Sequence, residues 1–454
     1  MARLFGTDGV RGVANKDLTC EIAYRLGQAA AIFMGSNIII GKDTRLSGDM
    51  LESAAAAGVM SAGGTALLAG IIPTPGVAFL VNGMHADGGI VISASHNPPK
   101  YNGIKLFDSQ GFKLPDEVED EIEKFIKAGG LEAVGEDSDI TVPDGDEVGV
   151  MVTIDRATDL YIEHAVSSIR AQGVDFSGLH IALDVGHGAS SLTSPLAFEQ
   201  LGAQVTVIND DFDGCDINVE CGSTCLDPLR KLMKDSGADV GIAHDGDADR
   251  VILMAPDGTE IDGDFMEAFL ALDMRERGVL ANDTVVTTVM CNVGFTKAMQ
   301  EAGITVVQTK VGDRYVLEEM REHGYSIGGE QSGHMILLDY NSTGDGLMTA
   351  CQYLAAVVRS GKTLDEAAKV MQRFPQTLLN VAVANNEAKE AFKTNEAIQE
   401  AVKAAEAELG DNGRVLVRPS GTECLVRVTV EAGTQEIADG IARRVADVVE
   451  SELA

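Results

Sequence analysis

The segment Asp239-Val-Gly-Ile-Ala-His-Asp-Gly-Asp-Ala-Asp-Arg250 joins an apolar strand directly to a polar loop. Residues 239–244 have the short, apolar character of a strand buried in an α/β sheet. Ligands in such sheets bind at the carboxyl ends of the strands, where backbone groups and helix N-termini converge. The segment therefore predicts an α/β sheet with a ligand site at one end of its strands.

Three carboxylates occupy alternate positions of this loop, at Asp245, Asp247 and Asp249. They form a hard oxygen site suited to Mg²⁺, and Arg250 adds a charge that neutralises phosphate. An EF-hand requires Gly and Glu where this chain has Arg250 and Pro256. An aspartate-nucleophile phosphatase requires Thr or Val after its Asp-x-Asp, whereas a third Asp and an Arg follow here. A solvated acidic turn remains the alternative in so acidic a chain.

A second polar loop, Ser93–Pro98 (Ser-Ala-Ser-His-Asn-Pro), follows the apolar strand Gly89–Ile92. Ser95 on such a turn is a candidate nucleophile if a base or a metal activates it, and His96 is adjacent. Lys105 supplies a cation that can reach the same loop. A capping serine is the simpler interpretation of an isolated Ser-His pair.

The third loop is Gly329–His334, with the sequence Gly-Glu-Gln-Ser-Gly-His. Glu330 and Ser332 can exchange hydrogen bonds with sugar hydroxyls. His334 titrates near neutral pH and can move a proton. An ordinary polar turn is the alternative.

The fourth loop, Arg418–Glu423, has hydroxyls, a flexible glycine and an arginine, and Arg427 follows it. Such a set can form a phosphate cradle from side chains and backbone N–H groups. The candidate cradle residues are Arg418, Ser420, Gly421, Thr422 and Arg427. Near the N-terminus, Gly6–Gly12 frames a further arginine, Arg11.

The formal net charge of −35 argues against nucleic acid and anionic membranes as partners. It should also repel a sugar phosphate, so a phosphate-binding chain must gather its cations in one place. The motifs supply such a cluster: Arg11, Lys105, Arg250, Arg418 and Arg427.

Features of the N-terminus and of the cysteines predict a cytoplasmic protein. The start, MARLFGTDGVRG, lacks the cationic stretch and apolar core of a signal peptide, and no apolar run approaches the roughly 20 residues that span a bilayer. Seven cysteines, an odd number spread over a long chain, indicate reduced thiols. The spacing of Cys215, Cys221 and Cys225 matches no standard zinc pair, and their role stays open.

The 454 residues exceed what one hydrophobic core accommodates. Strand and helix patterns alternate in three successive regions, with an acidic, Gly-rich linker at Gly129–Val150. A long Ala/Glu-rich helix over Asn386–Leu409 distinguishes the last region. We expect three similar mixed or parallel-sheet α/β domains plus a C-terminal α+β domain, with the active site in the central cleft. The expected domains are residues 1–150, 151–255, 256–370 and 371–454.

Together the four loops resemble those of the α-D-phosphohexomutase superfamily, in the family's order and over essentially the whole chain. The resemblance implies that Ser95 is the phosphoserine and that Mg²⁺ is bound by Ser95, Asp245, Asp247 and Asp249. It implies that Glu330 and Ser332 hold sugar hydroxyls. It assigns the non-transferred phosphate to Arg418, Ser420, Gly421, Thr422 and Arg427. The supporting catalytic groups would be Arg11, His96, Lys105, Arg250 and His334.

Within the superfamily, several stretches resemble the phosphoglucosamine mutases. These are Arg3–Gly12, Cys221–Thr224, Val311–Tyr315 and Gln331. Phosphomannomutase/phosphoglucomutase relatives usually have Met at the position of Gln331. Two positions depart from the pattern: Cys225 stands where His is frequent, and Cys424 where Pro is usual. Neither is a predicted ligand.

The resemblance implies an isomerase that interconverts glucosamine 6-phosphate and glucosamine 1-phosphate through a phosphoserine enzyme and a 1,6-bisphosphate. This reaction would feed UDP-N-acetylglucosamine synthesis, with a hexosamine or hexose 1,6-bisphosphate as activator. A phosphomannomutase/phosphoglucomutase, a non-catalytic sugar-phosphate sensor and a phosphatase are the alternatives. A sugar phosphate is the expected partner, and a homodimer is left open.

Overall fold

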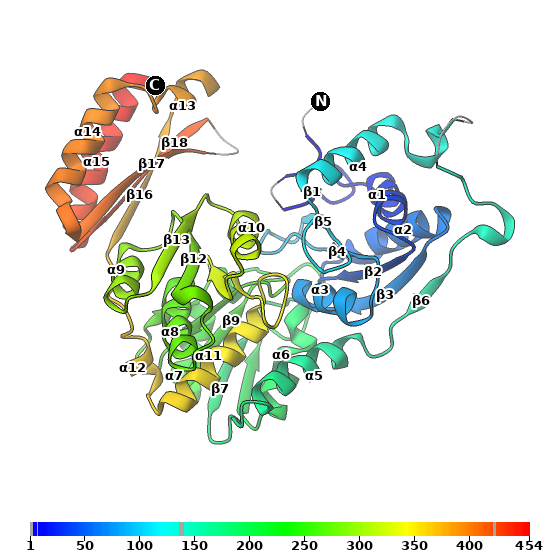
Figure 1. Ribbon diagram of the computed structural model, residues 1–454, viewed down its shortest axis with the longest axis horizontal. Helices are drawn as coiled ribbons and strands as arrows, with labels where there is room; N and C mark the ends of the chain where they lie inside the picture. The colour runs from blue at the N-terminus through cyan, green and yellow to red at the C-terminus, as the bar shows by residue number, and fades with distance from the viewer. Residues whose placement is uncertain (1–2, 7, 136–139, 421–423) are drawn as a thin grey trace. The chain divides into compact units, whose positions relative to one another are not determined.

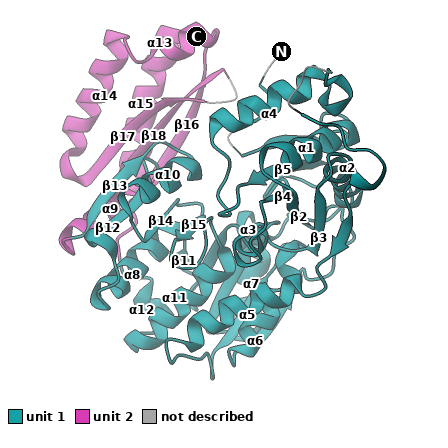
Figure 2. Cartoon of the chain, turned by 45° about the vertical axis from the view of Figure 1, so that its right-hand side comes forward, with its two compact units in different colours: residues 1–290, 304–370 teal, residues 291–303, 371–454 magenta. Residues whose placement is uncertain are grey.

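The chain forms two compact units, drawn in teal and magenta in Figure 2. Unit 1 comprises Met1–Met290 and Ile304–Val370, and unit 2 comprises Cys291–Gly303 and Met371–Ala454. The computed structural model describes residues 3–6, 8–135, 140–420 and 424–454. Within these residues, no helix has both the length and the apolar character needed to cross a bilayer.

The first sheet of unit 1 has six strands in the order β1-β5-β4-β2-β3-β6 (Figure 1). Its strands are β1 (Val10–Val13), β2 (Asn37–Lys42), β3 (Thr65–Ile71), β4 (Gly88–Ile92), β5 (Tyr101–Phe107) and β6 (Met151–Thr153). Its helices are α1 (Cys20–Phe33), α2 (Gly48–Ser61), α3 (Thr74–Gly83) and α4 (Asp116–Ala128). On one face of β2, Ile40 packs in a core with Leu51 of α2, and on the other face Gly41 lies against Val77 of α3. Because both faces are covered, the interior of this parallel strand, residues 38–41, is apolar and buried.

The second sheet has five strands in the order β11-β10-β9-β7-β8. Its strands are β7 (His180–Asp184), β8 (Gln204–Ile208), β9 (Val240–His244), β10 (Val251–Met254) and β11 (Glu260–Ile261). The helices of this region are α5 (Ala157–Arg170), α6 (Ser194–Gln200) and α7 (Asp227–Ser236). β7 and β9 are parallel, whereas β10 returns antiparallel to β9. The acidic loop is therefore the tight connection between β9 and β10.

The third sheet has four strands in the order β13-β12-β14-β15. Its strands are β12 (Thr284–Thr288), β13 (Thr305–Thr309), β14 (Ile327–Gly329) and β15 (Met335–Leu337). Its helices are α8 (Gly263–Glu276), α10 (Asp313–His323), α11 (Gly346–Ser360) and the short α12 (Leu364–Ala367). The Gly329–His334 loop joins β14 to β15, which pair antiparallel.

Unit 2 is built on a three-stranded antiparallel sheet in the order β16-β18-β17. Its strands are β16 (Gln376–Ala382), β17 (Gly413–Pro419) and β18 (Leu425–Ala432). Its helices are α9 (Val293–Glu301), α13 (Asn386–Ala391), α14 (Glu396–Leu409) and α15 (Gln435–Leu453). Apolar residues of α14 and α15 bury against the sheet and form a core of their own. Helix α9 joins this unit because the Asn292 side chain before it donates to the Phe374 carbonyl.

This architecture confirms the predicted fold class, α/β sheets followed by an α+β segment. The domain boundaries stay predictions. Strand β6 extends the first sheet to Thr153, past the predicted boundary at residue 150, because it pairs in parallel with β3. Helix α9, within the predicted third domain, groups with unit 2.

Candidate active site

Ser95 lies in the loop that follows β4, and its side chain is buried. Its hydroxyl donates to Asp245 Oδ2 at 2.6 Å, and His96 Nδ1 lies 3.3 Å from the same oxygen. The Ser95 backbone has φ +52°, the left-handed region that costs a non-glycine residue roughly 1–3 kcal/mol. The loop therefore holds one particular hydroxyl against the acidic loop at the expense of local strain.

Asp245, Asp247 and Asp249 follow β9 and are all buried. One oxygen of each lies within 4.8 Å of an oxygen of the others. Burial, followed by the charges of Asp249 and Asp247, raises the pKa of Asp245 well above its usual range. Burial acts in the same direction on Asp249, but the charges of Lys105, His334 and Arg250 lower the pKa of Asp249 well below its usual range.

The acidic cluster has the chemistry of a cation site. Asp247 Oδ1 and Asp249 Oδ1 are buried and have no hydrogen-bond partner among the described residues. Buried charged oxygens without partners are costly unless a cation meets them. An all-carboxylate donor set suits a hard divalent ion. The residues present therefore fit a bound metal.

Lys105 is the principal cation of this cluster, and it is buried on β5. Its Nζ lies 2.9 Å from Asp247 Oδ2, and 3.3 Å from both Asp249 Oδ2 and Asp8 Oδ2. Burial alone would lower the pKa of Lys105, but these carboxylates raise it well above its usual range. The lysine therefore remains charged.

Arg250 and His96 lie together beside Ser95. Arg250 Nη1 donates to His96 Nδ1 at 2.8 Å, so this ring nitrogen acts as an acceptor. Burial, reinforced by the charges of Arg250 and Arg11, lowers the pKa of His96 to about 4. His96 is therefore neutral at pH 7 and adds no charge beside the serine oxygen.

His334 lies beside Asp249 of the acidic loop. Its Nδ1 is 3.7 Å from Asp249 Oδ2, and its Nε2 is 3.4 Å from Asp313 Oδ2. Burial acts to lower the pKa of His334, but these two carboxylates raise it. Lys113 pairs with Asp313 and also with Asp8, so the charged network continues to the N-terminal segment.

Hydrogen bonds from two side chains of the Gly329–His334 loop fix it to neighbouring segments. Glu330 Oε1 accepts from the Gly312 N–H at 3.1 Å, and Gln331 Nε2 donates to Asp264 Oδ2 at 3.2 Å. Gly333 has φ +88°, and a Cβ there would lie 2.0 Å from the Val251 carbonyl oxygen. Ser332 is exposed. The side chains of Glu330 and Gln331 thus hold the loop in place, whereas that of Ser332 faces the surface.

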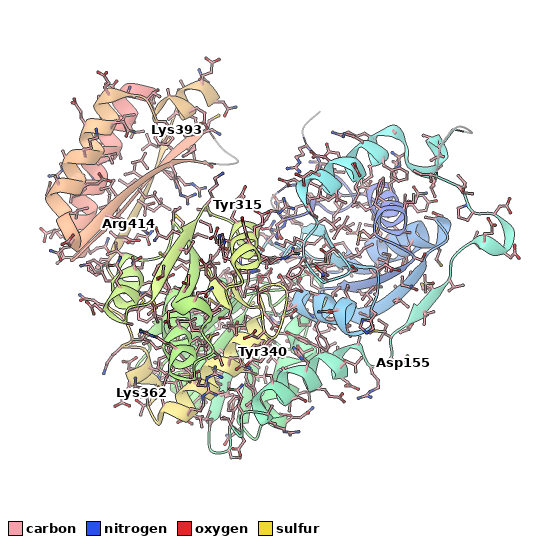
Figure 3. The ribbon with its side chains drawn as sticks, in the orientation of Figure 1. Asp155, Tyr315, Tyr340, Lys362, Lys393 and Arg414 are labelled. Carbon is pink, nitrogen blue, oxygen red and sulfur yellow. The ribbon has the colours of Figure 1, made fainter. Side chains whose placement is uncertain are left out.

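The fourth predicted loop belongs to unit 2. Arg418 and Arg427 are directly opposite each other in the register of β17 and β18. Burial and the charge of Arg427 both lower the pKa of Arg418. Arg414, labelled in Figure 3, forms an ion pair with Glu431 Oε1 at 2.9 Å. Like charges that face each other across two strands repel, so the proximity of Arg418 and Arg427 costs free energy.

Ser420 is buried at the start of this loop, and Lys389 Nζ on α13 donates to its carbonyl oxygen at 3.0 Å. The remaining predicted cradle residues, Gly421 and Thr422, lie outside the described residues.

Four domain families of one enzyme family together match most of the chain. These matches are described as phosphoglucomutase/phosphomannomutase α/β/α domain I over residues 2–132, domain II over 159–258, domain III over 262–374 and the C-terminal domain over 378–448. The chain belongs to the phosphoglucomutase/phosphomannomutase family.

Within this family the chain groups with the phosphoglucosamine mutases, which makes it an isomerase. It is 48% identical over 457 residues to the phosphoglucosamine mutase of Clostridium acetobutylicum, covering 100% of both chains. A phosphoglucomutase/phosphomannomutase family protein from Burkholderia thailandensis has a similar fold, with TM-score 0.82 and 23% identity over 100% of this chain and 99% of the other. N-acetylphosphoglucosamine mutase from Aspergillus fumigatus, solved with GlcNAc-6P and magnesium, gives TM-score 0.71 and 18% identity over 99% and 96%.

Unit 1 of this phosphohexomutase brings most of the predicted site residues into one hydrogen-bonded network. The members that contact one another are Ser95, His96, Lys105, Asp245, Asp247, Asp249, Arg250 and His334. Arg11 joins through Asp8, with which it forms an ion pair.

Several residues of this network were not predicted from the sequence. They are Asp8, Asp43, Arg45, Thr74, Lys113, Asn218 and Asp313. Some of them could have been predicted, because Asp43–Arg45 directly follows β2 just as the Ser95 loop follows β4. Lys113 and Asn218 lie in segments with no such pattern.

Proposed function

We propose that this chain interconverts glucosamine 6-phosphate and glucosamine 1-phosphate, with Ser95 as the phosphorylated nucleophile. The observation that carries the proposal is the 2.6 Å contact of Ser95 Oγ with Asp245 in a buried carboxylate cluster. The full-length identity of 48% to a phosphoglucosamine mutase supports the sugar. The reaction would feed UDP-N-acetylglucosamine synthesis.

In the forward direction the substrate 1-hydroxyl would attack the phosphorus of phospho-Ser95. The bond from phosphorus to Ser95 Oγ breaks as the bond to the sugar O1 forms, which gives a 1,6-bisphosphate. This intermediate then rotates end over end, so that its 6-phosphate faces Ser95. Ser95 Oγ attacks the 6-phosphate, and O6 leaves with the proton that O1 lost. Transfers of this kind depend mainly on positioning and on charge neutralisation.

The charged side chains have distinct parts in this mechanism. Lys105 and Arg250 would neutralise the transferring phosphoryl group, assisted by Arg11. Neutral His96 would accept from Arg250 and so position that arginine beside the serine oxygen, and His334 would hold or move a proton. The family of the chain and the Asp–Lys–His network around Ser95 support these assignments.

The carboxylate cluster is proposed to hold Mg²⁺ through Asp245, Asp247 and Asp249, together with Ser95. When bound, the ion would supply charge stabilisation to the serine phosphate. Glu330 and Ser332 would bind sugar hydroxyls. The phosphate that does not react would be bound by Arg418, Ser420, Gly421, Thr422 and Arg427. A hexosamine or hexose 1,6-bisphosphate would activate the enzyme, because it restores the phosphate on Ser95.

The test is a set of coupled turnover assays on glucosamine 6-phosphate, mannose 6-phosphate and glucose 6-phosphate, with Mg²⁺ and a trace of hexose 1,6-bisphosphate. Preference for the glucosamine compound supports the proposal. A large preference for mannose or glucose phosphate would favour a phosphomannomutase/phosphoglucomutase.

Variants of two serines separate catalysis from binding. Ser95→Ala should reduce turnover to background while sugar-phosphate binding, measured by calorimetry, stays near that of the native chain. Ser53→Ala, on the exposed side of α2, is the matched control and should retain full activity. Normal turnover by Ser95→Ala would exclude the phosphoserine role, and binding without turnover by the unmodified chain would indicate a sensor.

We also propose a cytoplasmic location, and a homodimer stays an open possibility. Seven cysteines without a disulfide among them in the described chain support a reducing compartment. Cell fractionation and light scattering test the two points separately.

A further inference from the structure

Arg45 lies buried beneath the Ser95 loop, at the end of β2. A guanidinium carries five N–H donors in a fixed planar fork. Here its Nη1 donates to the carbonyl oxygens of Pro98 and Tyr101, at 2.8 and 3.0 Å. Its Nη2 donates to the carbonyl oxygens of Ser95 and Asn97, at 2.9 and 2.8 Å. Four carbonyl groups, three in the Ser95 loop and one at the start of β5, thus converge on one side chain.

The fifth donor of Arg45 leads back to the same loop through Asp43. Arg45 Nε donates to Asp43 Oδ2 at 2.9 Å, and the Ser93 hydroxyl donates to that oxygen at 2.6 Å. The Ser93 hydroxyl in turn accepts from the Ser95 N–H at 2.9 Å. The carbonyl and the amide N–H of Ser95 are therefore both held by one closed ring of hydrogen bonds.

The sheet explains why these residues meet. Strands β2 and β4 are parallel neighbours, with Lys42 paired to Ile92. The segments that follow them, Asp43–Arg45 and the Ser95 loop, consequently leave the sheet at the same edge. The side chains of Arg45 and Asp43 are fully buried, so neither can exchange this arrangement for contact with water.

We propose that Arg45 is a positioning residue for phosphoryl transfer, which keeps the Ser95 backbone in its left-handed conformation and aims Oγ at the reacting phosphorus. This role rests on the proposed function of Ser95. The same serine oxygen must accept a phosphoryl group from one end of the sugar and donate it to the other. Its placement therefore affects both half-reactions, whereas sugar binding depends on other loops.

The first test is Arg45→Lys, which keeps the charge but cannot reach four carbonyls and a carboxylate together. We expect kcat to fall about 100-fold, the usual effect of a misplaced reacting atom, while KM for the sugar phosphate changes less than about twofold. Arg25→Lys is the matched control, because Arg25 Nη1 also donates to a carbonyl oxygen, that of Ile126, away from the site. Its kcat should match that of the native chain.

A second readout does not depend on turnover. Hydrogen exchange of the peptide covering residues 93–101 should become roughly tenfold faster in Arg45→Lys, since hydrogen bonds to a charged group are lost. Exchange elsewhere in the first sheet should stay unchanged. If the chain proves to have no mutase activity, this measurement still tests the loop, whereas the kinetic split tests its role in catalysis.

Two further variants, Arg45→Ala and Ser93→Ala, test the same positioning role. Added guanidinium should restore part of kcat to Arg45→Ala, and methylammonium should not. If both Arg45 variants fail to fold, Ser93→Ala decides, because it breaks the same ring and should lower kcat at constant KM. A folded Arg45→Lys or Ser93→Ala enzyme with native kcat overturns the proposal. So does unchanged exchange over residues 93–101 in Arg45→Lys.

Discussion

Replacing Thr74 by Val tests whether a hydroxyl outside the acidic loop sets the affinity of that loop for metal. Thr74 Oγ1 donates to Asp247 Oδ2 at 2.6 Å, and both residues are buried. Valine keeps the β-branched shape and removes only the hydroxyl group. A hydrogen bond to a charged group contributes about 1.5–3 kcal/mol, so we expect a loss of stability of that size.

The Thr74→Val replacement should have a larger effect on the affinity of the acidic loop for Mg²⁺. Without Thr74, Lys105 at 2.9 Å is the remaining described partner of Asp247 Oδ2, and Oδ1 of that carboxylate already lacks one. Removing an outer partner of a metal ligand typically lowers affinity about 10–100-fold. The Mg²⁺ concentration that half-saturates the mutase reaction should rise by this factor. At saturating Mg²⁺, kcat should return to near the native value.

Thr287→Val is the matched control for this measurement. Thr287 is buried on β12, and its Oγ1 has no hydrogen-bond partner among the described residues. Removing a buried hydroxyl without a partner should leave stability unchanged or increase it. Native Mg²⁺ dependence in Thr74→Val, or an equal shift in both variants, would refute the reasoning.

Three more predictions concern charge and specificity. Lys105→Met leaves Asp247 and Asp249 without their buried cation, so its loss of thermal stability, about 3–5 kcal/mol in EDTA, should shrink when Mg²⁺ is added. Burial lowers the pKa of His244 from 6.5 to about 4. The free energy of unfolding should therefore be highest above pH 6.5 and fall by roughly 3 kcal/mol as the pH drops to 4, because the unfolded chain takes up a proton first. In urea unfolding, the free energy of unfolding of His244→Gln should depend less on pH. Gln331→Met removes the amide that donates to Asp264 on α8. The kcat/KM for glucosamine 6-phosphate divided by that for glucose 6-phosphate should fall severalfold. An unchanged ratio would exclude a role of Gln331 in specificity.

Much of the site was predictable because its residues obey a local rule. Polar groups that directly follow parallel strands lie at one edge of a sheet, and this rule identified the loops of Ser95 and of Asp245–Asp249. The same rule applied to β2 would also have identified Asp43–Arg45. The resemblance of the motifs to a known family, rather than periodicity, predicted the chemistry.

The partners of these residues were not predictable, because hydrogen bonds between distant segments leave no local pattern. Thr74 is separated from Asp247, and Lys113 from Asp313, by 173 and 200 positions along the chain. The pKa shifts have the same origin, since they arise from burial and from charges contributed by several strands.

By itself, the amino-acid sequence determined which strands form, which loops carry hydroxyls and carboxylates, and to which family the chain belongs. These properties follow from residue type and spacing along one segment. Only the tertiary structure decided which ring nitrogen of His96 accepts, why Lys105 stays charged, and that Arg45 holds the carbonyl groups around Ser95. Each of these depends on distances between side chains that the folding of separate segments brings together.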